Sequence, residues 1–556
     1  MPPVFPTSSP PSVWSSSPSP SPSPLTLPPL HRRALLWAVP GVWTLALGLW
    51  GLSRQNSVWR DEAATWQVAR RSTGDILRML ENVDVVHGLY YLLMHGLFTC
   101  FGPSTTVLRL PSVLAMVVAS VCVTVLGNRL AGPWAGLGGG LAFGLLPAVQ
   151  FHLQEGRPYA LVAAGAGVST LLLVTAVQER AGRPARWAAY GATVLVCGLF
   201  NWLSLMILPA HLATLLWARA ARPVRMRWAM ASAAAVAGVL PLILFSRSQS
   251  GQVSWIPPLT WHMVIGPAVL LAIGGLGALL DRPRAGAGAG SGASAGSGAS
   301  AGSNRSAGRG TGAARGVGRL SAASVGLPLL AVPQLALAGL SFIQPLFLDR
   351  YVLFSLVGLA LLIGSAIGTA VRATRPRFPR ASRAVLPAVL AVATTALMPE
   401  SLAKRSPASR VDDVLAIAQD IRELGRDGDA VLYIPAARRD TRLVSPDAFT
   451  GLRDLALAQS PEESATLKGV EADPERIRAR MLTQERILLV TDAEPVPPAL
   501  STERDRLKTC VLGEHFTPGE DRRIRGRRVT VYERNHRAGY GHARSGTSTS
   551  GAISSC

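Results

Sequence analysis

The sequence predicts a mainly helical, polytopic membrane protein with about eleven transmembrane helices and a small soluble α/β domain at its C-terminal end. Three observations support this fold class. Hydrophobic residues make up 49% of the 556 residues, and only 16% are charged. The hydrophobic residues form blocks of about 20 residues, the length of helix that crosses a bilayer. From about Ser401 onward, this composition gives way to that of a soluble protein.

The predicted membrane spans follow one another between residues 34 and 398. They cover 34–53, 107–127, 133–151, 159–177, 187–201, 203–217, 228–246, 260–280, 322–342, 351–371 and 384–398. One further apolar segment, GLYYLLMHGLFTCFG, follows His87. With about 14 residues it is too short to span, so we expect an interfacial or re-entrant helix.

The basic residues of the chain indicate its orientation in the membrane. The net charge of +22 comes largely from arginines between the apolar blocks, which does not fit the basic face of a nucleic-acid-binding protein. Most of these arginines fall in alternate loops, whereas the short loops on the other side contain only Arg157, Arg247 and Arg350. The positive-inside rule therefore predicts a cytoplasmic N-terminus, and eleven spans place the C-terminal domain outside the cytoplasm.

Composition also divides the chain into segments. Pro/Ser-rich and Gly/Ala/Ser-rich stretches cannot bury enough apolar surface to fold, so we expect them to be disordered tails or flexible linkers. The expected segments are a cytoplasmic tail (1–30), a membrane domain (31–400) with an outer loop (54–106) and a cytoplasmic linker (285–318), an extracytoplasmic α/β domain (401–535) and a disordered tail (536–556).

The C-terminal domain is predicted from local patterns. VDDVLAIAQDIREL has apolar residues at helical spacing and acidic residues in its first turn. The segments AVLYIP, RILLVTD and RRVTVYER have the composition of strands. The domain contains no nucleotide-binding glycine fingerprint, and we assign no chemistry to it.

Two acidic residues in the outer loop are the first candidates for chemistry. Asp61 and Glu62 follow the first span closely, which places two carboxylates at the membrane surface. Adjacent carboxylates suit a general base with a supporting partner, or a divalent-cation site. The structural alternative is a solvated helix N-terminus in which the acids complement the helix dipole. Asp84 and His87 lie later in the same loop.

Two arginine–tyrosine neighbourhoods lie at the outer ends of later spans. Arg157 is followed by Tyr159 before the fourth span, and Arg350 by Tyr351 before the tenth. Guanidinium groups bind phosphate in a bidentate fork, so two converging arginines would suit a phospholipid-linked substrate. The alternative is that arginine and tyrosine only anchor the helices at the interface.

Five motifs in order resemble a known family. VWRDEAATW, DVVHGLYYLL, RLPSVL, QEGRPYAL and SFIQPLFLDRYVLFSL are similar to successive segments of the GT-C membrane glycosyltransferases, in the subgroup of protein O-mannosyltransferases and the lipid A aminoarabinose transferase. Each motif alone is weakly specific, and their order carries the resemblance. It covers about residues 34–371 and leaves out the linker and the C-terminal domain.

The resemblance implies an inverting transfer of a sugar from a polyprenyl-phosphate donor to an acceptor hydroxyl at the outer face. It implies mannose as the commonest sugar, a protein, lipid or polysaccharide acceptor, and no required cofactor, although a divalent cation would be compatible. The implied residues are Asp61 as general base, Glu62 as its support, Arg157 at the donor phosphate, Arg350 and Tyr351 at the far wall, and Asp84, His87 and Tyr159 as further site residues. Many relatives have Pro-Pro after the histidine, where this chain has Gly88-Leu89.

Two other classes of function are less consistent with the sequence. A secondary transporter needs ionisable residues within its spans and two related halves, whereas these spans contain almost no acids and only His211 stands out. A non-catalytic membrane scaffold would be free to lose the acids and arginines of the outer face, and this chain retains them.

Overall fold

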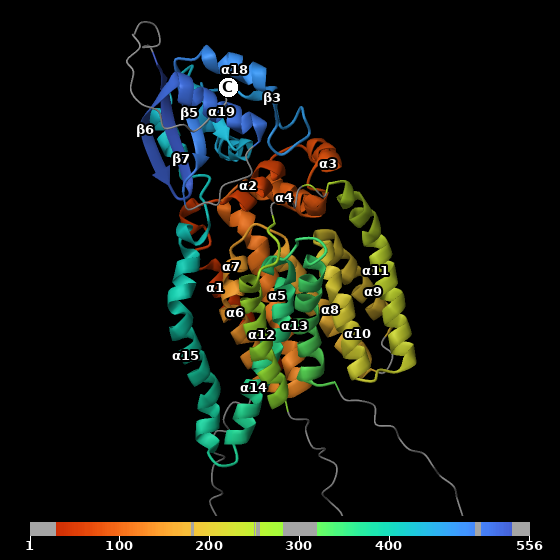
Figure 1. Cartoon of the computed structure of the whole chain (residues 1–556). Helices are drawn as coiled ribbons and strands as arrows, with labels where there is room; N and C mark the ends of the chain where they lie inside the picture. The colour runs from red at the N-terminus through yellow and green to blue at the C-terminus, as the bar shows by residue number, and fades with distance from the viewer. Residues whose placement is uncertain are drawn as a thin grey trace, which may run out of the picture.

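The structure is a computed structural model that describes residues 29–179, 183–249, 251, 256–281, 320–494 and 502–535. The predicted linker 285–318, the predicted tail 536–556 and all but the last two residues of the predicted tail 1–30 lie outside these residues. The described residues form a helical bundle beneath a smaller sheet-containing region (Figure 1).

Each predicted span coincides with a helix or with two helices in succession. The bundle consists of α1 (Pro29–Leu49), α5 (Thr105–Ala131), α6 (Pro133–Leu145), α7 (Pro147–Leu153), α8 (Tyr159–Gln178), α9 (Pro184–Phe200), η3 (Trp202–Met206), α10 (Ile207–Trp217), α11 (Arg222–Ser248), α12 (Trp261–Leu280), α13 (Ala322–Ser341), η5 (Asp349–Ser355), α14 (Leu356–Thr374) and α15 (Pro379–Arg405). Among the described residues, 7 helices are long and apolar enough to cross a membrane, or up to 8 if α6 and α7, which are bent by 63°, form one span. Other predicted spans are shorter helices, such as α9 with 17 residues, so length alone does not establish eleven crossings.

Burial separates the central helices from the peripheral ones. In the apolar window that includes α14, 83% of the residues are buried, whereas the value for α12 and for α15 is 11%. Small residues bring α6 and α14 together, since a Cβ atom added at Gly364 would lie 2.3 Å from the carbonyl oxygen of Ala135. The long helix α15 covers the outside of the bundle (Figure 1).

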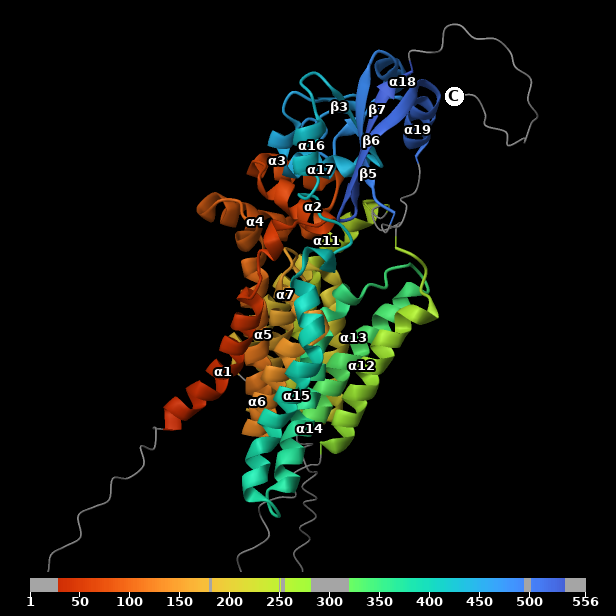
Figure 2. The same cartoon turned by 90° about the vertical axis from the view of Figure 1, so that its left-hand side faces the viewer.

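The outer loop is mostly helical and lies between the bundle and the sheet-containing region (Figures 1 and 2). It contains η1 (Arg54–Asn56), α2 (Arg60–Ala69), α3 (Thr73–Asn82), η2 (Val85–His87) and α4 (Gly88–Phe101). The short apolar segment is therefore a helix of 14 residues, α4. It buries Tyr90 and Phe98, whereas Phe101 is 72% exposed.

The C-terminal region contains a five-stranded sheet in the order β2-β1-β5-β7-β6. The strands are β1 (Ala430–Ile434), β2 (Arg453–Asp454), β5 (Arg486–Asp492), β6 (Phe516–Ile524) and β7 (Arg527–Arg534), and a separate pair joins β3 (Leu457–Gln459) to β4 (Val470–Glu471). Strand β1 runs parallel to β2 and β5, whereas β7 is antiparallel to β5 and β6. The three predicted strands are confirmed as β1, β5 and β7.

Helices cover both faces of this sheet. Val431 and Tyr433 pack with α16 (Ala418–Leu424), whereas Ala430 and Leu432 face α18 (Pro474–Leu482) and α19 (Glu503–His515). The short α17 (Asp440–Val444) contacts α2. The helix predicted over residues 411–424 begins only at Ala418, because Asp412 and Asp413 before it form hydrogen bonds with the outer loop.

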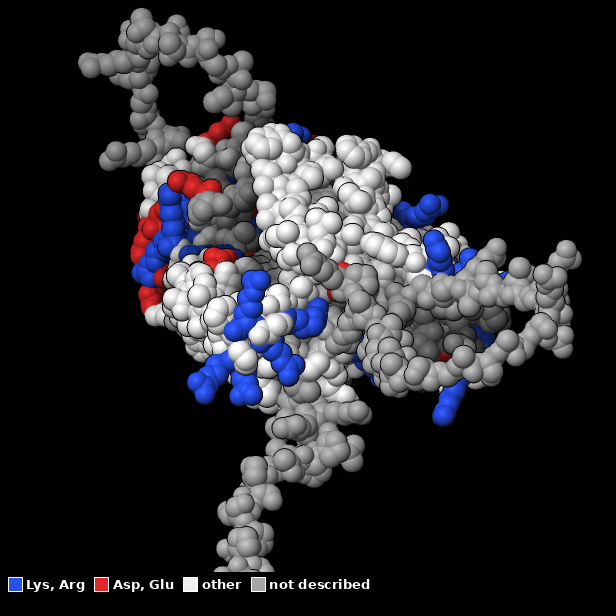
Figure 3. All heavy atoms as spheres, turned by 90° about the horizontal axis from the view of Figure 1, so that it is seen from below, with Lys and Arg blue, Asp and Glu red and all other residues white. Residues whose placement is uncertain are grey.

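Exposed arginines gather at the end of the bundle farthest from the sheet, as the view from below shows (Figure 3). They include Arg222, Arg225 and Arg227 at the start of α11, and Arg375 and Arg377 between α14 and α15. This is the charge distribution that the positive-inside rule associates with a cytoplasmic face.

Candidate active site

The first turn of α2 separates the two predicted acidic residues. Successive residues of a helix point about 100° apart around its axis, so Asp61 and Glu62 face different surroundings. The side chain of Asp61 is 22% exposed, whereas that of Glu62 is fully buried. The two carboxylates therefore cannot form one site as a pair.

Glu62 lies in a buried ion cluster. Its carboxylate accepts hydrogen bonds from Arg54 Nη2 at 2.9 Å, from Arg109 Nε and Nη2 at 2.8 and 2.7 Å, and from the backbone N–H of Gly156 at 2.9 Å. Burial alone would raise the pKa of Glu62, but Arg109 and Arg54 lower that pKa to about 2. Glu62 is therefore an ionised anchor that ties α2 to α5 and to the loop before α8.

Asp61 faces Arg350, which lies 289 residues later in the chain. Arg350 Nη1 donates a hydrogen bond of 2.6 Å to Asp61 Oδ2. The guanidinium carbon of Arg350 lies 5.9 Å from the ring centroids of both Tyr159 and Tyr351, within the range of a cation–π contact. Four of the predicted site residues thus lie together where α2, α8 and η5 meet.

Arg157 brings a second guanidinium group to Asp61. Its Nη1 lies 3.5 Å from the backbone carbonyl oxygen of Asp61, and its Nη2 lies 2.9 Å from His87 Nε2. Arg157 belongs to the loop between α7 and α8, and Arg350 belongs to η5. Two arginines from distant segments therefore meet at Asp61, Arg350 at its carboxylate and Arg157 at its backbone carbonyl oxygen, and such a pair of donors suits a phosphate group.

His87 connects this pair to the rest of the outer loop. Its Nδ1 lies 2.6 Å from Asp84 Oδ1, and Tyr91 donates its hydroxyl hydrogen to Asp84 Oδ2. Because Asp84 accepts the Nδ1 proton, Nε2 carries the lone pair that accepts from Arg157. Burial and the charge of Arg157 lower the pKa of His87, although Asp84 opposes them, and the neutral imidazole is favoured.

Three neighbours of the site were not identified from the sequence. Arg109 and Glu155 lie within the RLPSVL and QEGRPYAL motifs, but nothing local marked them as buried charges. Glu155 pairs with His152 Nδ1, and its Oε1 has no hydrogen-bond partner among the described residues. Tyr91 is the third such neighbour, because its hydroxyl group donates a hydrogen bond to Asp84. Their partners are distant in sequence or lie in a bend of the chain, so composition and periodicity gave no signal.

The site contains no obvious set of metal ligands. In the part of the chain that the structure describes, no three His, Cys, Asp or Glu side chains lie together in a way that could hold a metal ion. The positive charges beside Asp61 are those of Arg157 and Arg350.

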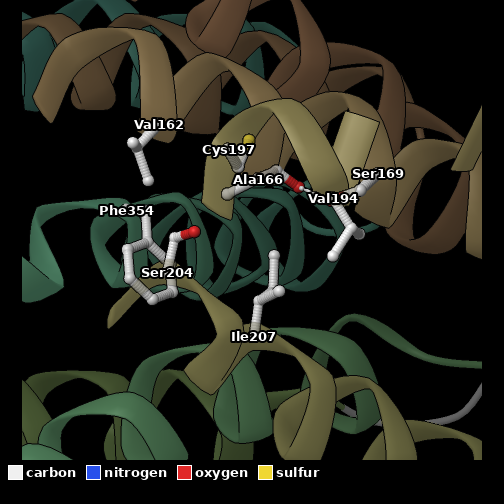
Figure 4. A pocket seen from close by; sticks show the side chains of 8 residues that line it. All are labelled: Val162, Ala166, Ser169, Val194, Cys197, Ser204, Ile207 and Phe354. Atoms are coloured by element: carbon white, nitrogen blue, oxygen red, sulfur yellow. Dashed lines mark hydrogen bonds between the residues drawn. The ribbon is translucent and has the colours of Figure 1, made fainter. Parts of the chain in front are cut away.

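A small pocket lies deeper in the bundle, among α8, α9, α10, η3 and η5 (Figure 4). It is lined by Val162, Ala166, Ser169, Val194, Cys197, Ser204, Ile207 and Phe354. Its walls are mostly apolar and carry no charged side chain, which distinguishes it from the Asp61 site. Phe354 and Arg350 belong to the same segment, η5, so that segment contributes both to this pocket and to the Asp61 site.

Comparison with known proteins identifies the fold. No protein-family model matches the sequence, and no curated protein matches it. The crystal structure of ArnT from Cupriavidus metallidurans in the apo state superposes with a TM-score of 0.54 at 13% identity, over 90% of this chain and 98% of that chain. The structure of the same protein bound to undecaprenyl phosphate superposes with a TM-score of 0.52 at 14% identity, over 92% and 100%. The chain therefore has the fold of these ArnT structures, and the predicted fold class, a mainly helical polytopic membrane protein with a small sheet-containing C-terminal region, is confirmed.

Proposed function

We propose that this multi-pass membrane protein, with its ArnT-like fold, is an inverting glycosyltransferase that moves a sugar from a polyprenyl-phosphate donor to an acceptor hydroxyl. The observation that carries the proposal is the ion pair of the half-buried Asp61 carboxylate with Arg350, beside which Arg157 Nη1 lies 3.5 Å from the backbone carbonyl oxygen of Asp61. Undecaprenyl phosphate is bound in one of the ArnT structures, which supports a polyprenyl-phosphate donor here.

Asp61 acts as the general base. Its carboxylate removes the proton of the acceptor hydroxyl, and the acceptor oxygen forms a bond to the anomeric carbon of the sugar. The bond from that carbon to the phosphate oxygen breaks in the same step, with its electron pair leaving on the phosphate. One displacement inverts the anomeric centre, and the reaction needs a single base within hydrogen-bond reach of the acceptor.

Arg157 and Arg350 hold the donor phosphate and stabilise the negative charge that the leaving phosphate gains. Tyr351 and Tyr159 line the wall beside Arg350. Arg350 pairs with Asp61, so donor binding would draw the guanidinium toward the phosphate and leave the carboxylate able to accept a proton.

His87, Asp84 and Glu62 hold Arg157 and the helix that carries Asp61 in position. His87, fixed by Asp84, accepts a hydrogen bond from Arg157 and orients its guanidinium group. Glu62 holds α2 in place and does not contact the reacting atoms. The two arginines neutralise the phosphate, so no step requires a metal ion.

The proposal also includes the orientation of the protein in the membrane and the identity of the transferred sugar. The protein lies in the cell membrane with its N-terminus in the cytoplasm and its α/β region outside, and the arginines at the opposite end of the bundle support this orientation (Figure 3). We take mannose as the sugar, because it is the commonest in the family that the motifs resemble. The acceptor is a hydroxyl of a protein, a lipid or a polysaccharide.

Neither alternative function gains support. His211 lies fully buried, with Nε2 at 3.0 Å from Thr170 Oγ1 and Nδ1 at 2.8 Å from Tyr190 OH. These contacts join α8, α9 and α10 and account for the histidine without a transport pathway. A scaffold would not need Asp61, which takes no part in the buried ion cluster that holds α2.

The test compares the wild-type chain with Asp61→Asn in membranes of the source cell from which the gene has been deleted. Radiolabelled mannose is followed from polyprenyl-phosphate-mannose to the acceptors of those membranes. We expect transfer by the wild type and none by the variant at equal expression. Equal transfer by both would exclude Asp61 as the base. Transfer only from another polyprenyl-phosphate sugar would replace mannose, and transfer from none would contradict the proposed function.

A further inference from the structure

The α/β region makes direct contact with the first residue of the helix that carries Asp61. Asp412 Oδ1 accepts a hydrogen bond of 3.1 Å from the backbone N–H of Arg60, and Asp412 Oδ2 accepts one of 3.0 Å from Arg60 Nε. The two residues are 352 positions apart in the chain, and Asp412 is only 1% exposed.

This contact replaces the cap that α2 lacks. The first N–H groups of a helix have no partner within it, and a side chain at the N-cap position usually accepts from one of them. The N-cap of α2 is Trp59, which makes no side-chain cap hydrogen bond. Asp412, from a distant part of the chain, therefore accepts a hydrogen bond from the first turn of α2, which is the role of an aspartate or serine at the N-cap of other helices.

The neighbouring residues form a continuous seam with the same segment. Asp413 Oδ1 accepts from the backbone N–H of Val58 at 3.2 Å, and the backbone N–H of Val414 donates to the carbonyl oxygen of Val58 at 2.6 Å. The entry to α2 is thus held on both sides of Trp59 by consecutive residues of the α/β region.

Asp412 is itself fixed to the sheet. Arg527, the first residue of β7, donates from Nη2 to Asp412 Oδ2 at 3.0 Å and to Asp440 Oδ2 at 2.9 Å. The side chains of Arg527 and Asp412 are both fully buried. The hydrogen-bonded β5–β7 pair is therefore connected through Arg527 and Asp412 to the start of α2.

We propose that Asp412 is a positioning residue for Asp61, and that the α/β region completes the catalytic helix through it. Three consecutive residues then have three separate tasks: Arg60 binds the α/β region, Asp61 faces the site, and Glu62 binds the bundle. The inference rests on the proposed function, because it gives Asp412 a role in the reaction only if Asp61 is the base.

Loss of the Asp412 carboxylate would leave the Arg60 N–H and the buried Arg527 without this partner. The first turn of α2 would then open more often, and the Asp61 carboxylate would spend less time in line with the acceptor. A displacement of about 1 Å at a reacting group can cost about 100-fold in rate. Arg157 and Arg350 belong to other elements, so donor binding should change little.

The activity test uses the full-length chain in the membrane transfer assay, with Asp412→Ala, Asp412→Glu and a control, Asp454→Ala. Asp454 is also buried in the α/β region and pairs with Arg439, but its hydrogen bonds stay within that region. We expect Asp412→Ala to lower the maximal rate on the order of 100-fold with little change in the KM for polyprenyl-phosphate-mannose. Asp412→Glu should restore part of the rate, and Asp454→Ala should retain the wild-type rate.

A second measurement does not depend on activity. Hydrogen exchange of the α2 backbone, residues 60–69, is compared in the detergent-purified wild type and in the same variants. Exchange at the start of α2 should be faster in Asp412→Ala than in Asp454→Ala.

A wild-type rate in Asp412→Ala while Asp61→Asn is inactive would overturn the inference, and so would unchanged exchange at α2. An equal loss of rate in Asp454→Ala would also do so, because any damage to the α/β region would then explain it. If Asp412→Ala does not accumulate, Asp412→Asn, which keeps an acceptor oxygen, is expected to show a smaller loss in the same direction. If the wild type transfers no sugar, the proposed function fails, and the exchange measurement alone decides whether Asp412 holds α2.

Discussion

Arg350 and Asp61 form an ion pair of 2.6 Å between η5 and the first turn of α2. The side chains are 15% and 22% exposed, so the pair lies at the boundary between the packed interior and the outer surface of the bundle. Arginine binds carboxylate and phosphate with the same fork of donors. In the proposed reaction, one guanidinium group can therefore bind both the Asp61 carboxylate and the donor phosphate.

Replacement of Arg350 by alanine should impair both donor binding and the chemical step. We expect the KM for the donor to rise and the maximal rate to fall, together on the order of 100- to 1,000-fold in kcat/KM. Arg350→Lys should lose less, because it keeps the charge but not the fork. The control is Arg247→Gln, an exposed arginine at the end of α11, which should behave as the wild type. Wild-type kinetics in Arg350→Ala would remove Arg350 from the site.

The buried cluster around Glu62 predicts a loss of stability in Glu62→Gln. This change leaves the positive charges of Arg54 and Arg109 without their carboxylate, and breaking a buried ion pair in this way costs about 3–5 kcal/mol. The melting temperature of the purified protein should fall, and α2 should be the first segment to lose protection in hydrogen exchange. An unchanged melting temperature would show that the cluster does not stabilise the fold.

The same cluster predicts a pH dependence of stability. The pKa of Glu62 is lowered from 4.5 to about 2 by folding, so its stabilising contribution is present above about pH 4.5 and is lost as the pH falls toward 2. The difference in melting temperature between the wild type and Glu62→Gln should therefore narrow from pH 5 to about pH 3. A difference that stays constant over this range would mean that folding does not lower the pKa of Glu62.

His87 predicts a pH dependence of donor binding. The pKa of His87 is lowered by burial and by Arg157, so the folded protein favours the neutral imidazole. Protonation, on the acid side of the ordinary histidine pKa, would place a hydrogen on Nε2, which could then no longer accept a hydrogen bond from Arg157. The KM for the donor should therefore rise with acidification, and only on the acid side of the ordinary histidine pKa. His87→Gln, which has an amide oxygen as acceptor, should show a flatter profile. An equally steep profile in this variant would assign the titration to another group.

The site predicts that transfer does not depend on a divalent cation. Arg157 and Arg350 supply the positive charge, and no metal-ligand cluster occurs among the described residues. Washing membranes with EDTA should leave the transfer rate within about twofold of the untreated value. A loss that Mg²⁺ or Mn²⁺ restores would favour the metal alternative for the acidic residues of the outer loop.

The sequence predicted those features that local patterns determine. Hydropathy located the helices of the bundle, and β propensity located β1, β5 and β7. The boundaries failed where tertiary contacts compete with local preference. The segment before Ala418 has a helical pattern, but Asp412 and Asp413 use their carboxylates on the outer loop instead. The length of the predicted apolar span 133–151 likewise gave no indication of the bend between α6 and α7.

The candidate site was predictable to a similar degree. Asp61, Arg157 and Arg350 were selected by residue type and by their position at the ends of spans, and the structure brings them together. The different surroundings of Asp61 and Glu62 were not predictable, because they depend on Arg109 in another helix. No local sequence pattern indicated a contact between Asp412 and α2, since its partner Arg60 lies 352 residues away in the chain.

The most direct test of the proposed mechanism is the rate of sugar transfer by Asp61→Asn at saturating donor, with undecaprenyl phosphate binding measured on the same purified protein. If Asp61 is the base and the arginines hold the phosphate, the variant should bind undecaprenyl phosphate as the wild type does, and its transfer rate should fall on the order of 1,000-fold. Transfer at the wild-type rate by a variant that binds the lipid normally would contradict the mechanism.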